Sequence, residues 1–295
     1  MGRKLLFIYN SKAGKAQLKN KLADILEVFA EAGYETTVAP TLKRGDAQNF
    51  AAERAGDYDL VVCSGGDGTL DETVTGLMQS GTGVPVGYIP AGSTNDFGGS
   101  LALPKNMVRA AETIVQGRDF PCDVGSFNKD TFVYIAAFGL FTDVSYETGQ
   151  DMKNVLGHMA YLLEGMKRLS AIRSFPMKVC WEGRTVEDDF IFGMVTNSTS
   201  VGGFKNITGK NVRLDDGVFE VTLIKRPKNP VELNSIMISL LNRDIDTKAM
   251  YCFRTSEITF TSEEFVAWTL DGENGGSHTE VTIRNICKGI SIRVR

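Results

Sequence analysis

The sequence is poor in histidine and cysteine, and it has no excess of positive charge. Its two histidines, His158 and His278, stand far apart, without neighbours that suggest a metal cluster or a nucleophilic triad. The five cysteines are widely spaced and odd in number, which indicates reduced thiols rather than a disulfide framework. With 32 basic and 36 acidic residues and a formal net charge of −4, the chain has no electrostatic basis for binding nucleic acid.

The chain also lacks a hydrophobic segment long enough to cross a bilayer. Its longest apolar run, Val133 to Phe141, is far shorter than the roughly 20 residues that a membrane-spanning helix needs. The first residues pass directly into a short predicted strand, without the apolar region and cleavage site of a signal peptide. We therefore expect a cytoplasmic protein whose contact with a membrane is peripheral.

What the sequence does contain is a change of pattern near its middle. From Lys4 to Val115, apolar strand patterns alternate with helical patterns, which predicts a parallel sheet flanked by helices. Beyond residue 120, short alternating strands dominate and predict a mainly antiparallel, sandwich-like β domain. A length of 295 residues with 42% hydrophobic residues is sufficient for two cores. We place the two domains at 1–124 and 125–295.

A glycine-rich loop, Gly65 to Gly68, follows the predicted strand Leu60 to Cys63, and a helical pattern begins near Thr69. Its three glycines let main-chain N–H groups approach a bulky anion, and the start of the helix adds partial positive charge. The remaining residue, Asp67, would repel a bare phosphate, so its presence suggests a bridging cation such as Mg²⁺. The loop therefore predicts a nucleotide that is bound with its metal. Taken alone, it is also compatible with a plain strand-to-helix turn.

A second polar loop, Pro90 to Phe97, follows the next predicted strand. It combines turn-forming proline and glycine with the hydroxyl and amide side chains of Ser93 to Asn95, at a predicted helix start. Together the two loops resemble those of the diacylglycerol kinase catalytic domain, which is found in a family of lipid kinases. NAD kinases and phosphofructokinases are its more distant relatives, so the resemblance implies an N-terminal α/β domain of their type.

By this resemblance, residues of four loops line an ATP site, and Asp67 reaches the Mg²⁺ of the nucleotide through water. The implied residues are Asn10, Ser11, Lys12, Ala13, Gly14, Thr41, Gly65, Gly66, Asp67, Gly68, Thr69, Leu70, Asp71, Glu72 and Thr94. The sequence departs from the family pattern at Gly98 and Gly99, where the family often has alanine and arginine. This departure leaves out a cation expected near the phosphates, for which Lys12, Lys15 and Arg44 are the candidate substitutes.

The turn Asp271-Gly272-Glu273, after the predicted strand Val266 to Leu270, is a candidate for the catalytic base. Phosphoryl transfer to a hydroxyl requires a carboxylate that accepts the proton of that hydroxyl. Two acids about a glycine are also common in plain turns, but the resemblance to the lipid kinases includes an acidic turn at a corresponding late strand. We expect Asp271 to be the general base, with Glu273 as a supporting acid or as the base itself.

A second acidic turn, from Arg213 to Val218, resembles the structural Mg²⁺ loop of bacterial members of the family. The resemblance implies an ion held by the Asp216 carboxylate and by the main-chain carbonyl oxygens of Arg213 and Val218. Such all-oxygen ligation suits a hard cation. The alternative is a simple Asp-Gly hairpin turn, which predicts no metal.

The segment Asp151 to Ile172 has apolar residues, several of them methionines, at helical spacing. This predicts a long helix whose apolar face either accommodates lipid chains or packs as an ordinary core or interface helix. Basic residues at and after its end either rest on anionic lipid headgroups or form a solvated face. They are Lys167, Arg168, Arg173 and Lys178.

These observations predict an ATP- and Mg²⁺-dependent kinase that phosphorylates the hydroxyl of diacylglycerol, or of a related lipid, in a cleft between two domains. The lipid substrate implies transient contact with the membrane surface, and the resemblance implies a homodimer. One alternative is a kinase of a soluble acceptor such as NAD, which the Pro90 to Phe97 loop disfavours. The other is a nucleotide-binding protein without catalysis, which the missing arginine suggests.

Overall fold

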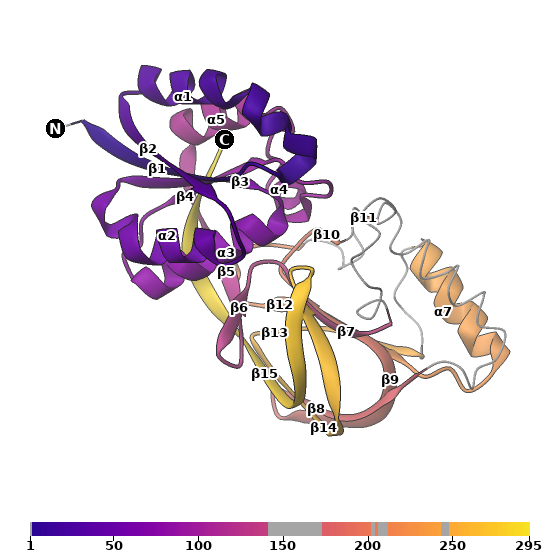
Figure 1. The fold of residues 1–295 in the computed structure, drawn as a ribbon. Helices are drawn as coiled ribbons and strands as arrows, with labels where there is room; N and C mark the ends of the chain where they lie inside the picture. The colour runs from indigo at the N-terminus through magenta and orange to yellow at the C-terminus, as the bar shows by residue number, and fades with distance from the viewer. Residues whose placement is uncertain (1, 141–172, 202–203, 206–211, 243–247) are drawn as a thin grey trace. The chain divides into compact units, whose positions relative to one another are not determined.

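The computed structural model describes residues 2–140, 173–201, 204–205, 212–242 and 248–295 (Figure 1). The chain divides into two compact units, one formed by Met1–Val124 with Cys287–Arg295 and the other by Gly125–Ile286. The helix expected over 151–172 lies outside the described residues, as do His158, Lys167 and Arg168. None of the helices that the structure describes combines the length and the hydrophobicity needed to cross a membrane.

The first unit is built on four parallel strands with helices on both faces. The strand order is β4-β3-β1-β2, and each neighbouring pair runs parallel. Figure 1 shows α1 and α5 over one face of this sheet and α2 and α3 over the other. The strands are β1 (Arg3–Asn10), β2 (Tyr34–Thr41), β3 (Leu60–Gly65) and β4 (Val86–Pro90). The helices are η1 (Ala13–Asn20), α1 (Leu22–Glu31), α2 (Asp46–Arg54), η2 (Ala55–Asp57), α3 (Asp67–Ser80), α4 (Asp96–Ser100) and α5 (Met107–Gln116).

Packing in the first unit follows from the apolar runs of its central strands. Residues 60–65 of β3 are all buried, as expected of a strand with helices on both faces. On one face Phe7 meets Phe29 of α1 edge to face, with ring centroids 5.5 Å apart. On the other face α2 and α3 pack so closely that a Cβ on Gly76 would lie 2.2 Å from the Gln48 carbonyl oxygen. The absence of a side chain at Gly76 therefore allows α3, which begins at Asp67, to pack against α2.

The second unit is a mainly antiparallel β structure, as the alternating strand patterns predicted. Its core is aromatic: the ring of Trp268 lies 4.8 Å from that of Phe138 and 5.1 Å from those of Phe127 and Phe260, between centroids. Among the described residues, the helix of this unit is α7 (Pro230–Asn242). The described strands, of which β5 and β15 also extend into the first unit, are β5 (Arg118–Phe127), β6 (Asp130–Phe132), β7 (Ile135–Gly139), β8 (Phe175–Trp181), β9 (Arg184–Thr196), β10 (Ser200–Val201), β11 (Phe204–Lys205), β12 (Phe219–Lys225), β13 (Met250–Thr255), β14 (Glu257–Leu270) and β15 (Glu273–Val294).

The expectation that the second domain extends to residue 295 is wrong for its last nine residues, 287–295, which belong to the first unit. There Ile292 of β15 pairs in parallel with Val86 of β4, and Arg293 Nε donates a hydrogen bond of 2.9 Å to the Ile114 carbonyl oxygen. β15 is one strand of 22 residues whose alternating pattern continues from one unit into the other. Because that pattern is the same in both units, it does not reveal the point at which the strand changes partners.

Candidate active site

The carboxyl ends of the parallel strands lie along one edge of the first unit's sheet. Asn10 stands opposite Thr41 in the pairing of β1 with β2, and Gly65 stands opposite Pro90 in the pairing of β3 with β4. Ligands of open α/β sheets bind beyond this edge. The residues predicted for ATP lie at the ends of β1, β2 and β3, in the loops after β1, β3 and β4, and in the first turns of η1 and α3, all of which follow this edge of the sheet.

The loops after β3 and β4 are bonded to each other. The Ala91 N–H donates to the Gly65 carbonyl oxygen over 2.8 Å. Asn95 closes the second loop on itself: its Oδ1 accepts from the Gly92 N–H at 2.9 Å, and its Nδ2 donates to the Gly92 carbonyl oxygen at 2.8 Å. The buried Tyr88 hydroxyl lies 3.2 Å from the Gly65 oxygen and 3.1 Å from Asn95 Oδ1. Asn95 thus shapes the loop, with a φ of +52° that asparagine tolerates better than most residues.

Two carboxylates belong to adjoining helix starts in this pair of loops. Asp67, half-buried, is the first residue of α3, and its Oδ2 accepts a hydrogen bond of 3.1 Å from the N–H of Asp96. Asp96 is itself buried, 4% exposed. Burial raises the pKa of Tyr88 well above its ordinary value, and the negative charges of Asp67 and Asp96 raise it further. The local environment is therefore electronegative and favours a cation.

The Asp67 carboxylate, at the start of α3 and beside Asp96, is of the type that can hold the Mg²⁺ of a nucleotide. Mg²⁺ is usually held by one or two carboxylates together with substrate phosphates. Within the described ranges no three His, Cys, Asp or Glu side chains converge as a metal cluster. Asp96 was not predicted as a site residue, although it directly follows Asn95 in the loop that carries the resemblance.

Of the other residues predicted around Asp67, Gly65 and Leu70 are constrained by packing, and Glu72 caps a neighbouring helix. Gly65 is required, because a Cβ there would lie 2.3 Å from Thr69 Oγ1. Leu70 is 1% exposed and packs inward, so only its main chain can face a ligand. The Glu72 carboxylate accepts hydrogen bonds from the N–H of Gly45 at 2.8 Å and of Ala47 at 3.3 Å. These contacts make Glu72 a cap for the start of α2.

Around the first loop the turn is closed by Asn10, whose Oδ1 accepts from the Lys12 N–H at 2.9 Å. Lys12 and Thr94 are exposed, while Ser11, Ala13 and Thr41 are half-buried. α3 begins at Asp67, two residues before the predicted start, so the N–H groups of Asp67 and Gly68 lie at the positive end of the helix. Gly68 and Asp71 are half-buried on this helix. Gly14, predicted as part of the turn after Asn10, lies within η1.

In the second unit, Asp271 and Glu273 flank a tight turn and have different surroundings. Asp271 is buried, and its carboxylate accepts hydrogen bonds from the N–H groups of three successive residues, Val133, Tyr134 and Ile135. Glu273, the first residue of β15, is exposed. An exposed carboxylate can approach a substrate hydroxyl, whereas the oxygens of Asp271 face the chain itself.

In the predicted metal loop, the Asp216 carboxylate is paired with the side chain of Arg254. Asp216 Oδ2 accepts a hydrogen bond from the Arg254 guanidinium, and Asp216 Oδ1 lies 3.4 Å from the Val218 nitrogen. Arg254 also donates from Nε to Glu220 Oε1 over 3.1 Å. The carboxylate that a metal would need is thus paired with Arg254, so Mg²⁺ at this loop would have to replace that ion pair. Val218 and Arg213 flank the turn, and Arg213 pairs with Asp215 at 3.4 Å.

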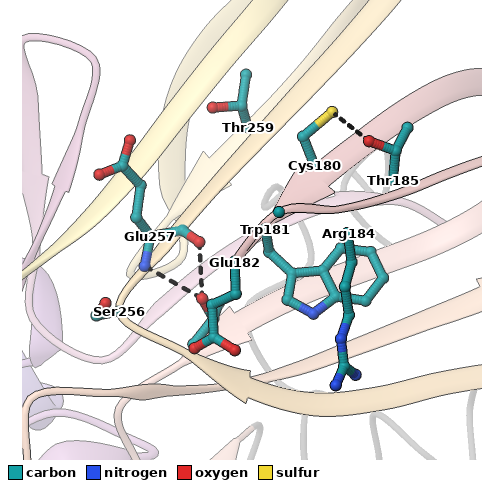
Figure 2. A pocket seen from close by; sticks show the side chains of 10 residues that line it. Cys180, Trp181, Glu182, Arg184, Thr185, Ser256, Glu257 and Thr259 are labelled. Atoms are coloured by element: carbon teal, nitrogen blue, oxygen red, sulfur yellow. Dashed lines mark hydrogen bonds between the residues drawn. The ribbon is translucent and has the colours of Figure 1, made fainter.

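A pocket of about 460 Å³ opens in the second unit, at the hairpin between β8 and β9 and the start of β14 (Figure 2). One wall carries Cys180, Trp181 and Glu182, and the other carries Ser256 and Glu257. The Trp181 ring stacks on Phe253 with centroids 4.1 Å apart. The candidate residues lie elsewhere in the chain, so this pocket is distinct from the predicted site.

Comparison with known proteins identifies the family. Residues 4–127 match the model of the diacylglycerol kinase catalytic domain, and residues 137–289 match that of the YegS C-terminal NAD kinase beta sandwich-like domain. A diacylglycerol kinase of Bacillus subtilis is 32% identical over 271 residues, which cover 91% of this chain and 89% of that protein. The chain belongs to the diacylglycerol kinase family. As a member of this family it is a kinase, an enzyme that uses ATP as the phosphoryl donor.

Two further diacylglycerol kinases are similar to this chain, one in sequence and one in structure. A diacylglycerol kinase of Staphylococcus carnosus is 32% identical over 279 residues, which cover 94% of this chain and 90% of that protein. The crystal structure of a diacylglycerol kinase from Bacillus anthracis superposes with a TM-score of 0.77 at 25% identity, covering 100% of this chain and 97% of that one. These matches span most of this chain and most of each relative.

Proposed function

We propose that the chain transfers the γ-phosphate of ATP to the hydroxyl of diacylglycerol or of a closely related lipid. One observation carries this proposal: the bonded pair of loops in which Asp67 begins α3 and accepts the N–H of Asp96. A helix start, glycine-freed amides and the Asp67 carboxylate suit a magnesium-bound triphosphate. The names of the relatives supply the acceptor, since they are diacylglycerol kinases.

In this proposal the first unit binds the nucleotide, and it has the type of fold found in NAD kinases and phosphofructokinases. The turn after Asn10, the strand end at Thr41, residues 65–72 and Thr94 surround ATP. Asp67 would hold the Mg²⁺ of the nucleotide through water, with the buried Asp96 beside it, and the ion would neutralise charge on the transferred phosphoryl group. Glu72 contributes through α2 rather than by touching the nucleotide, because its carboxylate caps that helix.

The second unit contributes the acceptor side of the reaction. The hydroxyl of the lipid must lose its proton as the new bond to phosphorus forms, and a carboxylate within hydrogen-bond reach accepts it. Of the two candidates, exposed Glu273 suits this role better than buried Asp271. The metal site at Asp216 stays a prediction, and an ion there would have to displace Arg254.

A lipid acceptor also implies where the enzyme acts. We propose a cytoplasmic protein that touches the membrane surface transiently, because its substrate is held there. The homodimer is likewise carried over from the resemblance. Both are measurable, by sedimentation of the protein with lipid vesicles and by its mass in solution.

The test is an assay with labelled ATP, Mg²⁺ and diacylglycerol in mixed micelles. We expect label in phosphatidic acid, and a loss of about 100-fold in kcat for Asp67→Asn, in line with the loss of a charge-stabilising group. The exposed Asp57→Asn makes the same chemical change outside the site and should match the wild type.

Binding of ATP separates the metal role of Asp67 from a general loss of structure. With Mg²⁺ present, Asp67→Asn should bind ATP more weakly; without Mg²⁺ it should bind ATP at least as well as the wild type, because one negative charge is gone. Transfer to NAD but to no lipid would instead support a kinase of a soluble acceptor. Binding of ATP without transfer to any acceptor would support a non-catalytic protein.

A further inference from the structure

The carboxylate of Asp271 sits in a nest of main-chain donors. Its Oδ2 accepts from the Val133 N–H at 2.5 Å, and its Oδ1 accepts from the N–H groups of Tyr134 and Ile135, both at 2.9 Å. Successive N–H groups that converge in this way form an anion-binding concavity. Hydrogen bonds to an ionised acceptor are about twice as strong as neutral ones. The side chain therefore fastens the end of β14 to the connection between β6 and β7.

The main chain of Asp271 makes a fourth bond to the same segment. Its N–H donates to the Ile135 carbonyl oxygen over 2.8 Å. Asp271 and Gly272 have φ values of +50° and +85°, and Leu270 pairs with Glu273 across them. Two central residues with positive φ define a type I′ hairpin turn, for which Asp-Gly is a favoured sequence. Asp271 thus shapes the turn with its backbone and fixes the turn in place with its carboxylate.

Glu273 comes directly after this turn and depends on it for its position. The conformation of the turn sets the direction of the first residue of the strand that follows it. Leu270, the pairing partner of Glu273, is also paired with Ala136 of β7, next to the residues that Asp271 holds. Loss of the Asp271 carboxylate would release both strands at the position of Glu273.

Asp271 itself is badly placed to exchange a proton with a substrate. Its oxygens face donors of its own chain, and a proton on one of them would put an O–H group among three N–H groups. A general base needs an oxygen that reaches the acceptor hydroxyl. Glu273, exposed at the start of β15, has no such constraint from burial.

We infer that Asp271 is a positioning residue, which holds the exposed carboxylate of Glu273 in place through the amides of residues 133–135. The inference rests on the proposed lipid kinase function for its catalytic part. Its structural part, the anchoring of the turn, does not depend on which substrate the enzyme uses.

The experiment compares Asp271→Asn, Glu273→Gln and Asp130→Asn in the full chain. Asp130→Asn is the matched control, since it makes the same change at an exposed position of β6. Two quantities are measured: amide hydrogen exchange of residues 133–135, and the pH profile of kcat with diacylglycerol. Asparagine tolerates the positive φ at position 271, so the turn itself stays accessible.

For Asp271→Asn we expect exchange at 133–135 to accelerate about 10-fold or more, because opening of the segment becomes easier. Its kcat should fall by about 10- to 100-fold, as expected for a misplaced catalytic group, while the pH profile keeps its shape. Glu273→Gln should leave the exchange unchanged and lower kcat by about 100- to 10,000-fold, as loss of a general base does. Asp130→Asn should match the wild type in both.

Unchanged exchange at 133–135 in Asp271→Asn would overturn the inference, and so would loss of the acid limb of its pH profile. If Asp271→Asn does not fold, Asp271→Gly removes the carboxylate at a position where glycine is best tolerated, and the same two readouts apply. If the wild type phosphorylates no lipid, the proposed function fails. The exchange data then still decide whether Asp271 anchors the turn.

Discussion

Gly92 lies against Gly66 so closely that a Cβ on Gly92 would stand 2.6 Å from the Cα of Gly66. The same Cβ would be 2.8 Å from Asn95 Oδ1, which binds the Gly92 N–H. On the other side, the Gly65 carbonyl oxygen accepts the Ala91 N–H. The two loops of the proposed nucleotide site are therefore one packed structure, and glycine is needed at position 92 for close approach rather than for flexibility.

Gly92→Ala should separate the two loops. We expect ATP affinity to fall about 10-fold or more, with a loss of stability of about 1 to 3 kcal/mol from overpacking. Titration calorimetry with ATP and Mg²⁺, together with thermal unfolding, measures both. Gly99→Ala is the matched control, because no atom lies within 4 Å of a Cβ at that position. Equal ATP affinity for the two variants would contradict the packing argument.

Glu72→Gln tests whether this residue serves the helix or the nucleotide. Because its carboxylate caps α2 through Gly45 and Ala47, we expect a loss of about 1 to 2 kcal/mol in the free energy of unfolding. The KM for ATP should change by less than about twofold. Glu53→Gln, an exposed position on α2 itself, is the control. A large rise in KM with unchanged stability would instead make Glu72 an ATP ligand.

Glu220 should make the stability of the protein depend on pH. Burial raises the pKa of Glu220 from 4.5 to about 7, against the opposing charge of Arg254. A carboxyl group whose pKa is raised by folding stabilises the folded state below its unfolded pKa, and this contribution is lost as the pH rises through the folded pKa. Between pH 4.5 and pH 7 the wild type should therefore lose stability relative to Glu220→Gln.

We expect this relative loss to be about 1 to 2 kcal/mol, less than the full shift implies because water and Arg254 screen the charge. Urea unfolding at a series of pH values measures it. The exposed Glu187→Gln should retain the pH dependence of the wild type. Parallel curves for the wild type and Glu220→Gln would show that Glu220 does not titrate in this range.

Chelation of metal ions should leave the melting temperature of the nucleotide-free wild type unchanged, because Arg254 already pairs with Asp216. Arg254→Gln removes that guanidinium, so added Mg²⁺ should stabilise this variant by about 1 to 3 kcal/mol at saturating concentration. Arg184→Gln, exposed and in the same unit, should show no response to Mg²⁺. A drop in the wild-type melting temperature that Mg²⁺ reverses would show that the loop at Asp216 binds a metal after all.

The sequence by itself determined the features that depend on neighbours along the chain. The spacing of apolar residues indicated strands alternating with helices before residue 120 and alternating strands after it, and the structure has this order. The two loops, 65–68 and 90–97, could be recognised because glycine, proline and polar caps act on their own local backbone. The family followed from the same residues.

The tertiary structure decided which partner each carboxylate has. Glu72 binds N–H groups 27 and 25 residues away, Asp271 binds N–H groups 136 to 138 residues away, and Asp216 pairs with Arg254. The return of residues 287–295 to the first unit is of the same kind. A sequence motif reveals that an acid stands at a turn, but whether that acid meets amides, a guanidinium or solvent depends on which distant segment the fold brings beside it.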